Sequence, residues 1–292
     1  MGGLRYQQHL GINLLSQLSN YALAIMGLLM NKIKRIEKIA EHLYKAHTSK
    51  AKFENLKGVL KPRSISEAYM VQKRLNERRK NDGIGRIAGH KVALTSQAIQ
   101  KLVGLTSPIA ASIFSSTIYK SPTEINLKRF VHLGLEFELA FKMRDDVKQR
   151  TSCTVACISE LVGSIMPAFE LIEDRNANYN NLDPASLIAD NAWCGGIVLG
   201  APIKNWRNAD LFSTPVRLSY NNEIIDSTTG AAMGNPFNSL IWLALFLIEQ
   251  GRPLKRGDIV MSGSTLATRF PKHGDHVIYS IDNQERVEVK IC

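Results

Sequence analysis

The stretch Leu135-Glu-Phe-Glu-Leu-Ala-Phe141 alternates in character, which predicts a β-strand with two chemically different faces. Glu136 and Glu138 fall on one face, and three large apolar residues fall on the other. Carboxylates about 6 to 7 Å apart on one face repel each other, and taking each out of water costs several kcal/mol unless a cation is near. A surface strand with solvated charges is the alternative. The apolar second face favours burial and a bound hard metal, for which oxygen ligands suit Mg²⁺ or Mn²⁺.

A second alternating strand supplies a third carboxylate. In Pro167-Ala-Phe-Glu-Leu-Ile-Glu-Asp-Arg175, Glu170 shares a face with Ala168 and Ile172 and interrupts an otherwise apolar side. Three glutamates gathered in a small space would repel strongly. A divalent ion would relieve most of this repulsion and leave coordination positions for water or a chelating substrate. The alternative is that Glu170 pairs with an arginine across the sheet.

The charge of the chain is concentrated at one end. The 292 residues are 45% hydrophobic, which is enough for a sizeable core in one large domain or two modest ones. The formal net charge is +11, and residues 1–80 alone carry 16 basic and 5 acidic side chains. The rest of the chain is therefore balanced. A basic helical face without a nucleic-acid-binding motif is typical of a solvated surface, so we expect no nucleic-acid partner.

The cysteines and the N-terminal residues indicate the compartment. Cys153 and Cys157 are four residues apart on an expected helix and lack the paired spacing of a zinc site, so we predict a reduced, cytoplasmic protein. The apolar run 21–30 is shorter than the roughly 20 residues of a membrane span, and we expect no membrane partner. Arg5 precedes this run as in a signal peptide, but a basic helix follows it in place of a cleavage site. Residues 1–29 are treated as an extension, either native or created by the choice of a start codon ahead of Met30.

Residues 30–88 have the periodicity of helices. Ile33, Ile36, Ala40, Leu43 and Ala46 recur at helical intervals within 31–48. A capping-box pattern, Ser64-Ile-Ser-Glu67, precedes a second apolar periodicity that ends near Gly83. We therefore predict a helical N-terminal region.

From Gly89 onward the sequence favours strands. Short apolar runs broken by Gly, Pro and Asn predict strands at 91–94, 135–141, 168–172 and 195–199. Hairpins are expected around Asn221-Asn222 and Asp282-Asn283. One helix is expected to begin after Asn235 as its N-cap and to stop at Gly251. The predicted class is α+β, with a strand-rich body over 89–292 and the helical region packed on it.

Beyond these local patterns, the chain resembles the 2-keto-4-pentenoate hydratases of the fumarylacetoacetate hydrolase superfamily. The resemblance runs from about Ile33 to the C-terminus. The motifs that carry it, in order, are Glu67-Ala-Tyr-Met-Val-Gln72, Gly89-His-Lys-Val-Ala-Leu-Thr-Ser96, Leu133-Gly-Leu-Glu-Phe-Glu-Leu-Ala-Phe141, Pro167-Ala-Phe-Glu-Leu-Ile-Glu-Asp-Arg175, Ala189-Asp-Asn-Ala192, Gly230-Ala-Ala-Met-Gly-Asn-Pro236, Trp242-Leu-Ala244, Gly257-Asp-Ile-Val260 and Ser262-Gly-Ser264.

The resemblance implies a fold and a set of site residues. The implied fold is a fumarylacetoacetase-like roll of mixed β-sheet, a pseudo-barrel, usually assembled as an oligomer. Glu136, Glu138 and Glu170 would be the Mg²⁺ or Mn²⁺ ligands, and Lys91 the active-site lysine. Without the resemblance, a lysine at the start of a strand is as readily a surface group whose apolar stem is buried.

The implied activity is hydration of a 2-hydroxy-2,4-dienoate, or its 2-oxo tautomer, to a 4-hydroxy-2-oxo acid. The metal would act as a Lewis acid toward the carboxylate and the neighbouring oxygen. Lys91 would add positive charge or, if burial lowers its pKa, move a proton. Asp190 is a weaker candidate for proton transfer, because Asp before a turn is often only turn chemistry. Ser264 and Arg269 are candidate substrate-binding residues, and a simple turn is the alternative for Ser264.

Three departures from the family pattern bear on the substrate. The segment Ile113-Phe-Ser-Ser-Thr117 lacks an acidic residue that many such hydratases carry, Ala93 replaces a common glycine, and Trp193 replaces a smaller residue. The alternatives to hydration are therefore decarboxylation of a vinylogous 2-oxo diacid of the 4-oxalocrotonate type, or a non-catalytic partner subunit of such an enzyme.

Overall fold

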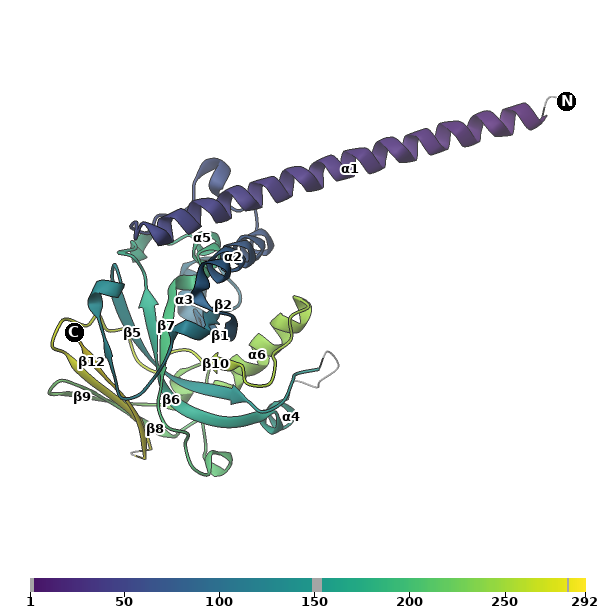
Figure 1. The fold of residues 1–292 in the computed structure, drawn as a ribbon. Coiled ribbons are helices and arrows are strands. Elements are labelled where there is room, and N and C mark those ends of the chain that lie inside the picture. Colours follow the sequence, from purple (N-terminus) through teal and green to yellow (C-terminus); the bar gives the residue numbers. More distant parts are fainter. Residues whose placement is uncertain (1–2, 149–153, 283) are drawn as a thin grey trace.

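The N-terminal region is a long helix that joins the body only at its C-terminal end. The computed structural model describes residues 3–148, 154–282 and 284–292, with side chains from Leu23 onward. Helix α1 (Gly3–Thr48) projects from the body along most of its length (Figure 1). The expected helix over 31–48 is the last part of α1. There Ile36, Ala40 and Leu43 are buried as predicted, whereas Ile33 is 52% exposed.

Helix α2 (Ile65–Arg79) packs against α1 and against α5 (Pro184–Ala189). The predicted cap is present, since the Ser64 hydroxyl accepts a hydrogen bond from the Glu67 N–H at 3.1 Å. The Glu67 carboxylate accepts from the Arg63 N–H at 2.6 Å and pairs with Arg35 of α1, so it fixes α1 to the start of α2. A single π-helical turn, Lys80–Ile84, follows α2 and leads into the first strand.

The larger sheet is curled into an open barrel. Its strand order is β2-β1-β10-β5-β6-β7-β3, and β2 also contacts β7 across the opening. Two of the pairings, β1 with β10 and β3 with β7, are parallel and the others antiparallel, which makes the sheet mixed. The strands are β1 (Ile87–Ala93), β2 (Ile109–Phe114), β3 (Ile118–Lys120), β5 (Leu133–Met143), β6 (Val162–Glu173), β7 (Cys194–Leu199) and β10 (Ile259–Met261).

A second sheet covers the outer side of β5 and β6. It has the order β4-β12-β11-β8-β9 and contains both predicted hairpins; Asn221 occupies one turn with φ 53°, and Asn283 of the other lies outside the described residues. The buried ring of Tyr279 lies 5.9 Å from that of Phe137. The apolar face of the Glu136 strand is thus the contact between the sheets. The strands are β4 (Thr123–Ile125), β8 (Pro215–Tyr220), β9 (Glu223–Thr228), β11 (His276–Ile281) and β12 (Glu285–Ile291).

Three further helices complete the body: α3 (Gln97–Leu102), α4 (Val155–Glu160) and α6 (Pro236–Glu249). The Asn235 side chain caps α6 as predicted, accepting from the Phe237 N–H at 2.9 Å. With its preceding turn, α6 is long and apolar enough to cross a membrane by composition alone. Leu240, Leu243 and Leu247 are buried, however, and the Phe237 ring lies 5.0 Å from that of Phe141, so this face of α6 packs in the core. Cys157 lies exposed in α4, and Cys153 falls outside the described residues.

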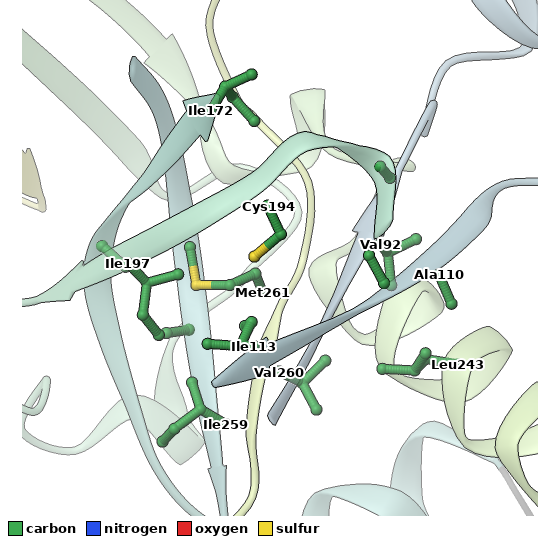
Figure 2. Packing of buried hydrophobic residues seen from close by; sticks show 14 of the residues in the cluster. Val92, Ala110, Ile113, Ile172, Cys194, Ile197, Leu243, Ile259, Val260 and Met261 are labelled. Atoms are coloured by element: carbon green, nitrogen blue, oxygen red, sulfur yellow. The ribbon is translucent and has the colours of Figure 1, made fainter. Parts of the chain in front are cut away.

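The concave face of the larger sheet carries the glutamates. Lys91 pairs with Met261, Met261 with Ala140, and Ala140 shares a face with Glu138, so these side chains point to the same side of the sheet. Figure 2 shows Met261 and Cys194 among the apolar side chains of this interior. The α+β roll with a helical N-terminal region is the predicted fold.

Gly89 sets the closest approach of β1 to β10. A Cβ on Gly89 would lie 2.2 Å from the Ile259 carbonyl oxygen, whereas a Cβ on the strand residue Gly163 would meet only the Arg144 Cβ at 3.3 Å. We expect Gly89→Ala to lower the free energy of unfolding by about 2 kcal/mol or more, because β1 must move off β10. The control Gly163→Ala should change it by about 1 kcal/mol or less. Chemical denaturation measures both, and equal stability of the two variants would contradict the close approach.

Candidate active site

Three glutamates from β5 and β6 meet inside the curled sheet. Glu136 lies directly opposite Glu170 in the antiparallel register, and Glu138 lies opposite Ala168. One carboxylate oxygen from each of the three glutamates lies within 4.8 Å of the others. Glu138 and Glu170 are fully buried, and Glu136 is partly exposed. The alternation of the two strands therefore brings the carboxylates together as predicted, away from solvent.

Lys91 reaches the same cluster from β1. Its Nζ lies 2.5 Å from Glu170 Oε1, and the side chain is buried. Two strands, β10 and β5, separate β1 from β6 in the sheet, so the contact exists because the sheet curls. The partner of Glu170 is a lysine, and the alternative of an arginine is wrong. Lys91 is also not a surface group.

The segment after β10 runs along β5 and supplies two more contacts. The Gly263 N–H donates to Glu138 Oε2 at 2.8 Å, and the Thr268 hydroxyl donates to Glu136 Oε1 at 2.8 Å. Sequence reasoning missed both donors. The Ser262-Gly-Ser264 motif contains Gly263, but the sequence analysis assigned a binding role only to Ser264. That hydroxyl accepts from the Phe137 N–H at 3.0 Å and donates to the Leu266 carbonyl at 2.8 Å, so it holds the segment against β5.

Burial and mutual repulsion shift the protonation of the cluster. Burial raises the pKa of Glu138 well above its usual range, and the other two carboxylates raise it further. Burial also raises the pKa of Glu170, although the Lys91 ammonium opposes this. For Lys91 burial lowers the pKa, but the Glu170 carboxylate outweighs burial and the pKa is raised. The single Lys91 ammonium therefore does not supply enough positive charge to balance the three carboxylates, even when Lys91 is protonated.

The carboxylate geometry fits a divalent cation. Within the described residues, Glu138 Oε1 is buried and has no hydrogen-bond partner, although its other oxygen is held by Gly263. Leaving such an oxygen unpaired costs a desolvation penalty that a cation would remove. The set contains only oxygen donors, which are the ligands of Mg²⁺, Mn²⁺ and Ca²⁺. The donor set therefore fits a hard cation.

Asp190 belongs to a separate buried cluster. Its Oδ1 lies 2.8 Å from His47 Nε2, and its Oδ2 lies 3.1 Å from Arg175 Nη2. Burial raises the pKa of Asp190, but the His47 and Arg175 contacts outweigh it and hold the pKa below its ordinary value. Burial lowers the pKa of His47, so the neutral ring donates from Nε2. These contacts join α1, β6 and the end of α5.

The guanidinium of Arg269 lies away from the glutamates. The Arg269 backbone pairs with Leu135, so its side chain leaves β5 on the Leu135 face, opposite Glu136. There it pairs with Glu223 of β9 at 3.1 Å. The structure brings the three glutamates and Lys91 together, but not Arg269.

A strained turn follows Asp190. Asn191, Ala192 and Trp193 have φ values of 57°, 43° and 56°, a left-handed conformation that costs energy in residues other than glycine. The buried Asn191 side chain holds the turn by bonding both the N–H and the carbonyl of Ser112, each at 2.9 Å. The turn places Cys194 opposite Ile172, and burial raises the pKa of the Cys194 thiol to about 12.

Aromatic rings form a wall at the Glu136 end of the cluster. Phe270 stacks on His132 with ring centroids 4.7 Å apart, and Tyr179 lies 6.3 Å from Phe270 and 5.4 Å from Trp193. Phe270 lies over Gly134, two residues before Glu136 on the same face; a Cβ at Gly134 would meet its ring at 3.4 Å. Of these rings, the sequence had singled out only Trp193, for its size.

The fold and this carboxylate site define a known class. The chain belongs to the fumarylacetoacetate hydrolase family, because the model of the fumarylacetoacetate (FAA) hydrolase C-terminal family matches residues 88–291. Within that family it groups with the 2-keto-4-pentenoate hydratases. It is 30% identical to the 2-keto-4-pentenoate hydratase of Paraburkholderia phymatum over 238 residues, which cover 80% of this chain and 89% of the relative.

Two further comparisons found similarity to 4-oxalocrotonate decarboxylases. The chain is 25% identical over 240 residues to a 4-oxalocrotonate decarboxylase of Pseudomonas putida, covering 82% of this chain and 90% of the relative. Among solved structures, the 4-oxalocrotonate decarboxylase from Pseudomonas putida G7, complexed with magnesium and adipate, matches with a TM-score of 0.81 and 22% identity. The match covers 89% of this chain and 98% of that chain, and it confirms the fold.

The Asp190 cluster predicts a structural effect. Asp190→Asn keeps the shape but removes the charge facing Arg175, so we expect the free energy of unfolding at pH 7 to fall by about 3 kcal/mol. The control Asp226→Asn breaks an exposed, solvent-screened pair with Arg217 and should change the free energy of unfolding far less.

The Asp190 contribution should also depend on pH. The folded-state pKa of the Asp190 carboxyl is depressed. Its contribution to stability is therefore fully present above the ordinary pKa of 3.8 and is lost as the pH falls through the folded-state pKa. Urea titrations of both variants at several pH values measure the effect. A loss for Asp190→Asn no larger than that of the control would contradict it.

Proposed function

We propose that this protein is a divalent-metal-dependent hydro-lyase that adds water to a 2-hydroxy-2,4-dienoate to give a 4-hydroxy-2-oxo acid. The observation that carries the proposal is the buried arrangement of Glu136, Glu138 and Glu170, with the Lys91 ammonium 2.5 Å from Glu170. The hydratase names of the relatives at about 30% identity support it. We further propose that residues 89–292 form the catalytic domain and that the protein acts in the cytoplasm as a homo-oligomer.

Glu136, Glu138 and Glu170 would hold Mg²⁺ or Mn²⁺. When bound, the cation supplies a Lewis acid that draws negative charge onto the substrate's carboxylate and adjoining oxygen. Gly263 and Thr268 fix the orientation of two of the carboxylates by hydrogen bonds. Because their positions are set before the ligand arrives, little reorganisation is needed when charge develops.

Lys91 acts as a fixed positive charge in this proposal. Its raised pKa keeps it protonated at neutral pH, which favours electrostatic stabilisation over the role of a general base. Because the Lys91 ammonium lies 2.5 Å from Glu170, it would lie beside a substrate oxygen bound at the cluster. In the reaction the 2-hydroxyl group gives up its proton and becomes the ketone, and water supplies one proton and a hydroxyl group. The two protons add to C3 and C5, and the hydroxyl group bonds to C4, so the atoms balance.

Decarboxylation of a vinylogous 2-oxo diacid is the second candidate. It uses the same stabilised negative charge, and the similarity to 4-oxalocrotonate decarboxylases favours it. It differs in that a carbon–carbon bond breaks and carbon dioxide leaves. A non-catalytic partner subunit remains the third candidate.

Turnover of the two substrates separates these candidates. With Mg²⁺ present, we expect the protein to consume 2-hydroxypenta-2,4-dienoate, seen as loss of the diene absorbance, and to form 4-hydroxy-2-oxopentanoate. A chelator should abolish the reaction and added Mg²⁺ should restore it. Carbon dioxide release from 4-oxalocrotonate without diene consumption would favour the decarboxylase. Turnover of neither substrate, alongside tight metal binding, would favour the partner subunit.

Metal binding depends on charge at the cluster. Glu138→Gln keeps the side-chain shape and removes one negative charge, so we expect the affinity for Mn²⁺ to fall at least about 100-fold while the protein stays folded. Glu124→Gln, which alters an exposed residue of β4, is the matched control and should bind as the parent does. Calorimetric titration with Mn²⁺ measures both, and circular dichroism checks the fold. Unchanged affinity in Glu138→Gln would rule out the ligand assignment.

A further inference from the structure

A cavity of about 300 Å³ opens where the helical region meets the curled sheet. Its walls come from the end of α1, the end of α2 and the start of β7. None of the three glutamates lines this cavity, but Cys194 does. The cavity therefore borders the carboxylate cluster without being part of it.

Cys194 marks the boundary between the two. It pairs with Ile172, which follows Glu170 by two residues on the same face of β6, so Cys194 stands about 7 to 8 Å from Glu170 across the sheet. Figure 2 shows its side chain directed into the barrel beside Met261. Beside the effect of burial, the Glu170 carboxylate raises the pKa of the Cys194 thiol, and the Lys91 and Arg79 cations lower it. A ligand held at the glutamates and extending past Cys194 would enter the cavity.

Arg79 lines this cavity as an unpaired cation. Its side chain lies over the Phe114 ring, with Cζ 5.0 Å from the centroid, and Nη1 is buried without a hydrogen-bond partner among the described residues. The guanidinium is desolvated to the extent that its pKa is lowered. Arg79 is half-buried, and its Nη1 has lost water without gaining an acceptor, which is costly.

The acidic groups of the cavity are engaged elsewhere. The Glu173 carboxylate accepts N–H groups of Val131, His132 and Arg175 at 2.8, 3.1 and 3.3 Å. Asp82 acts on the Tyr44 hydroxyl and raises the pKa of Tyr44. Arg175, a buried arginine of the wall, is paired with Asp190. Arg129 also lines the cavity, but it is exposed and lies over the Tyr119 ring. Among the described arginines of the wall, only Arg79 has a buried nitrogen without a hydrogen-bond partner.

We propose that Arg79 binds a second carboxylate of the substrate, so that the preferred ligand is a 2-oxo or 2-hydroxy-dienoic diacid rather than a monoacid. This inference rests on the proposed function, because the first carboxylate is held at the metal cluster. The guanidinium fork matches a carboxylate in charge and in geometry. Arg79 is thus a specificity-determining residue at the far end of the site.

The test compares acids that differ only in the distal carboxylate. With saturating Mg²⁺, the affinities of 2-oxohexanedioate and 2-oxohexanoate, and of the corresponding seven-carbon pair, are measured by calorimetry. We expect the parent protein to bind a diacid at least about tenfold more tightly than its monoacid. Arg79→Gln should abolish this preference while leaving monoacid affinity within about twofold, and Arg79→Lys should restore part of it.

A control on the same helix isolates the position of the charge. Arg74→Gln removes one positive charge from the exposed face of α2, where Arg74 pairs with Glu37 and Glu77, and should keep the full diacid preference. Monoacid binding without a diacid preference, or a preference that survives Arg79→Gln, would overturn this inference and leave the proposed function standing. Failure of all four acids to bind with metal present would overturn both.

Discussion

The structure depends on negative charge packed inside a sheet. Glu138 and Glu170 are fully buried, Glu136 lies directly across from Glu170, and Lys91 is their one cationic contact within the described chain. If these side chains faced solvent, water would screen their mutual repulsion at little cost. Instead, the apolar face of β5 packs on the second sheet and forces the glutamates inward. The same packing that stabilises the fold thus keeps the carboxylates in a medium where their charges act strongly.

Much of this could be predicted from local pattern. The period of two around Glu136, Glu138 and Glu170 predicted both strands and the shared face, because alternation in a strand fixes which way a side chain points. The caps at Ser64 and Asn235 followed from equally local chemistry. The order of motifs then gave the family, and with it the pseudo-barrel.

Contacts set by the curl of the sheet could not be predicted from local pattern. Lys91 meets Glu170 across two intervening strands, and no spacing in the sequence encodes that approach. Thr268 reaches Glu136 because its segment extends β10 along β5, and Arg269, one residue later, points the opposite way. Asp190, expected near the chemistry, pairs with His47 from a helix more than a hundred residues earlier. Such contacts depend on tertiary geometry, which a single sequence reveals only through resemblance.

In the proposed site, the two ends come from different parts of the chain. The three glutamates and Lys91 lie on strands of the curled sheet, which are packed on both faces. Arg79 is the last residue of helix α2, which has one exposed face. Substitutions in α1 and α2 can therefore reshape one end of the cavity without disturbing the cation ligands. Under selection for a new carbon source, we expect substitutions to accumulate in α1 and α2, while the three glutamates and Lys91 stay unchanged.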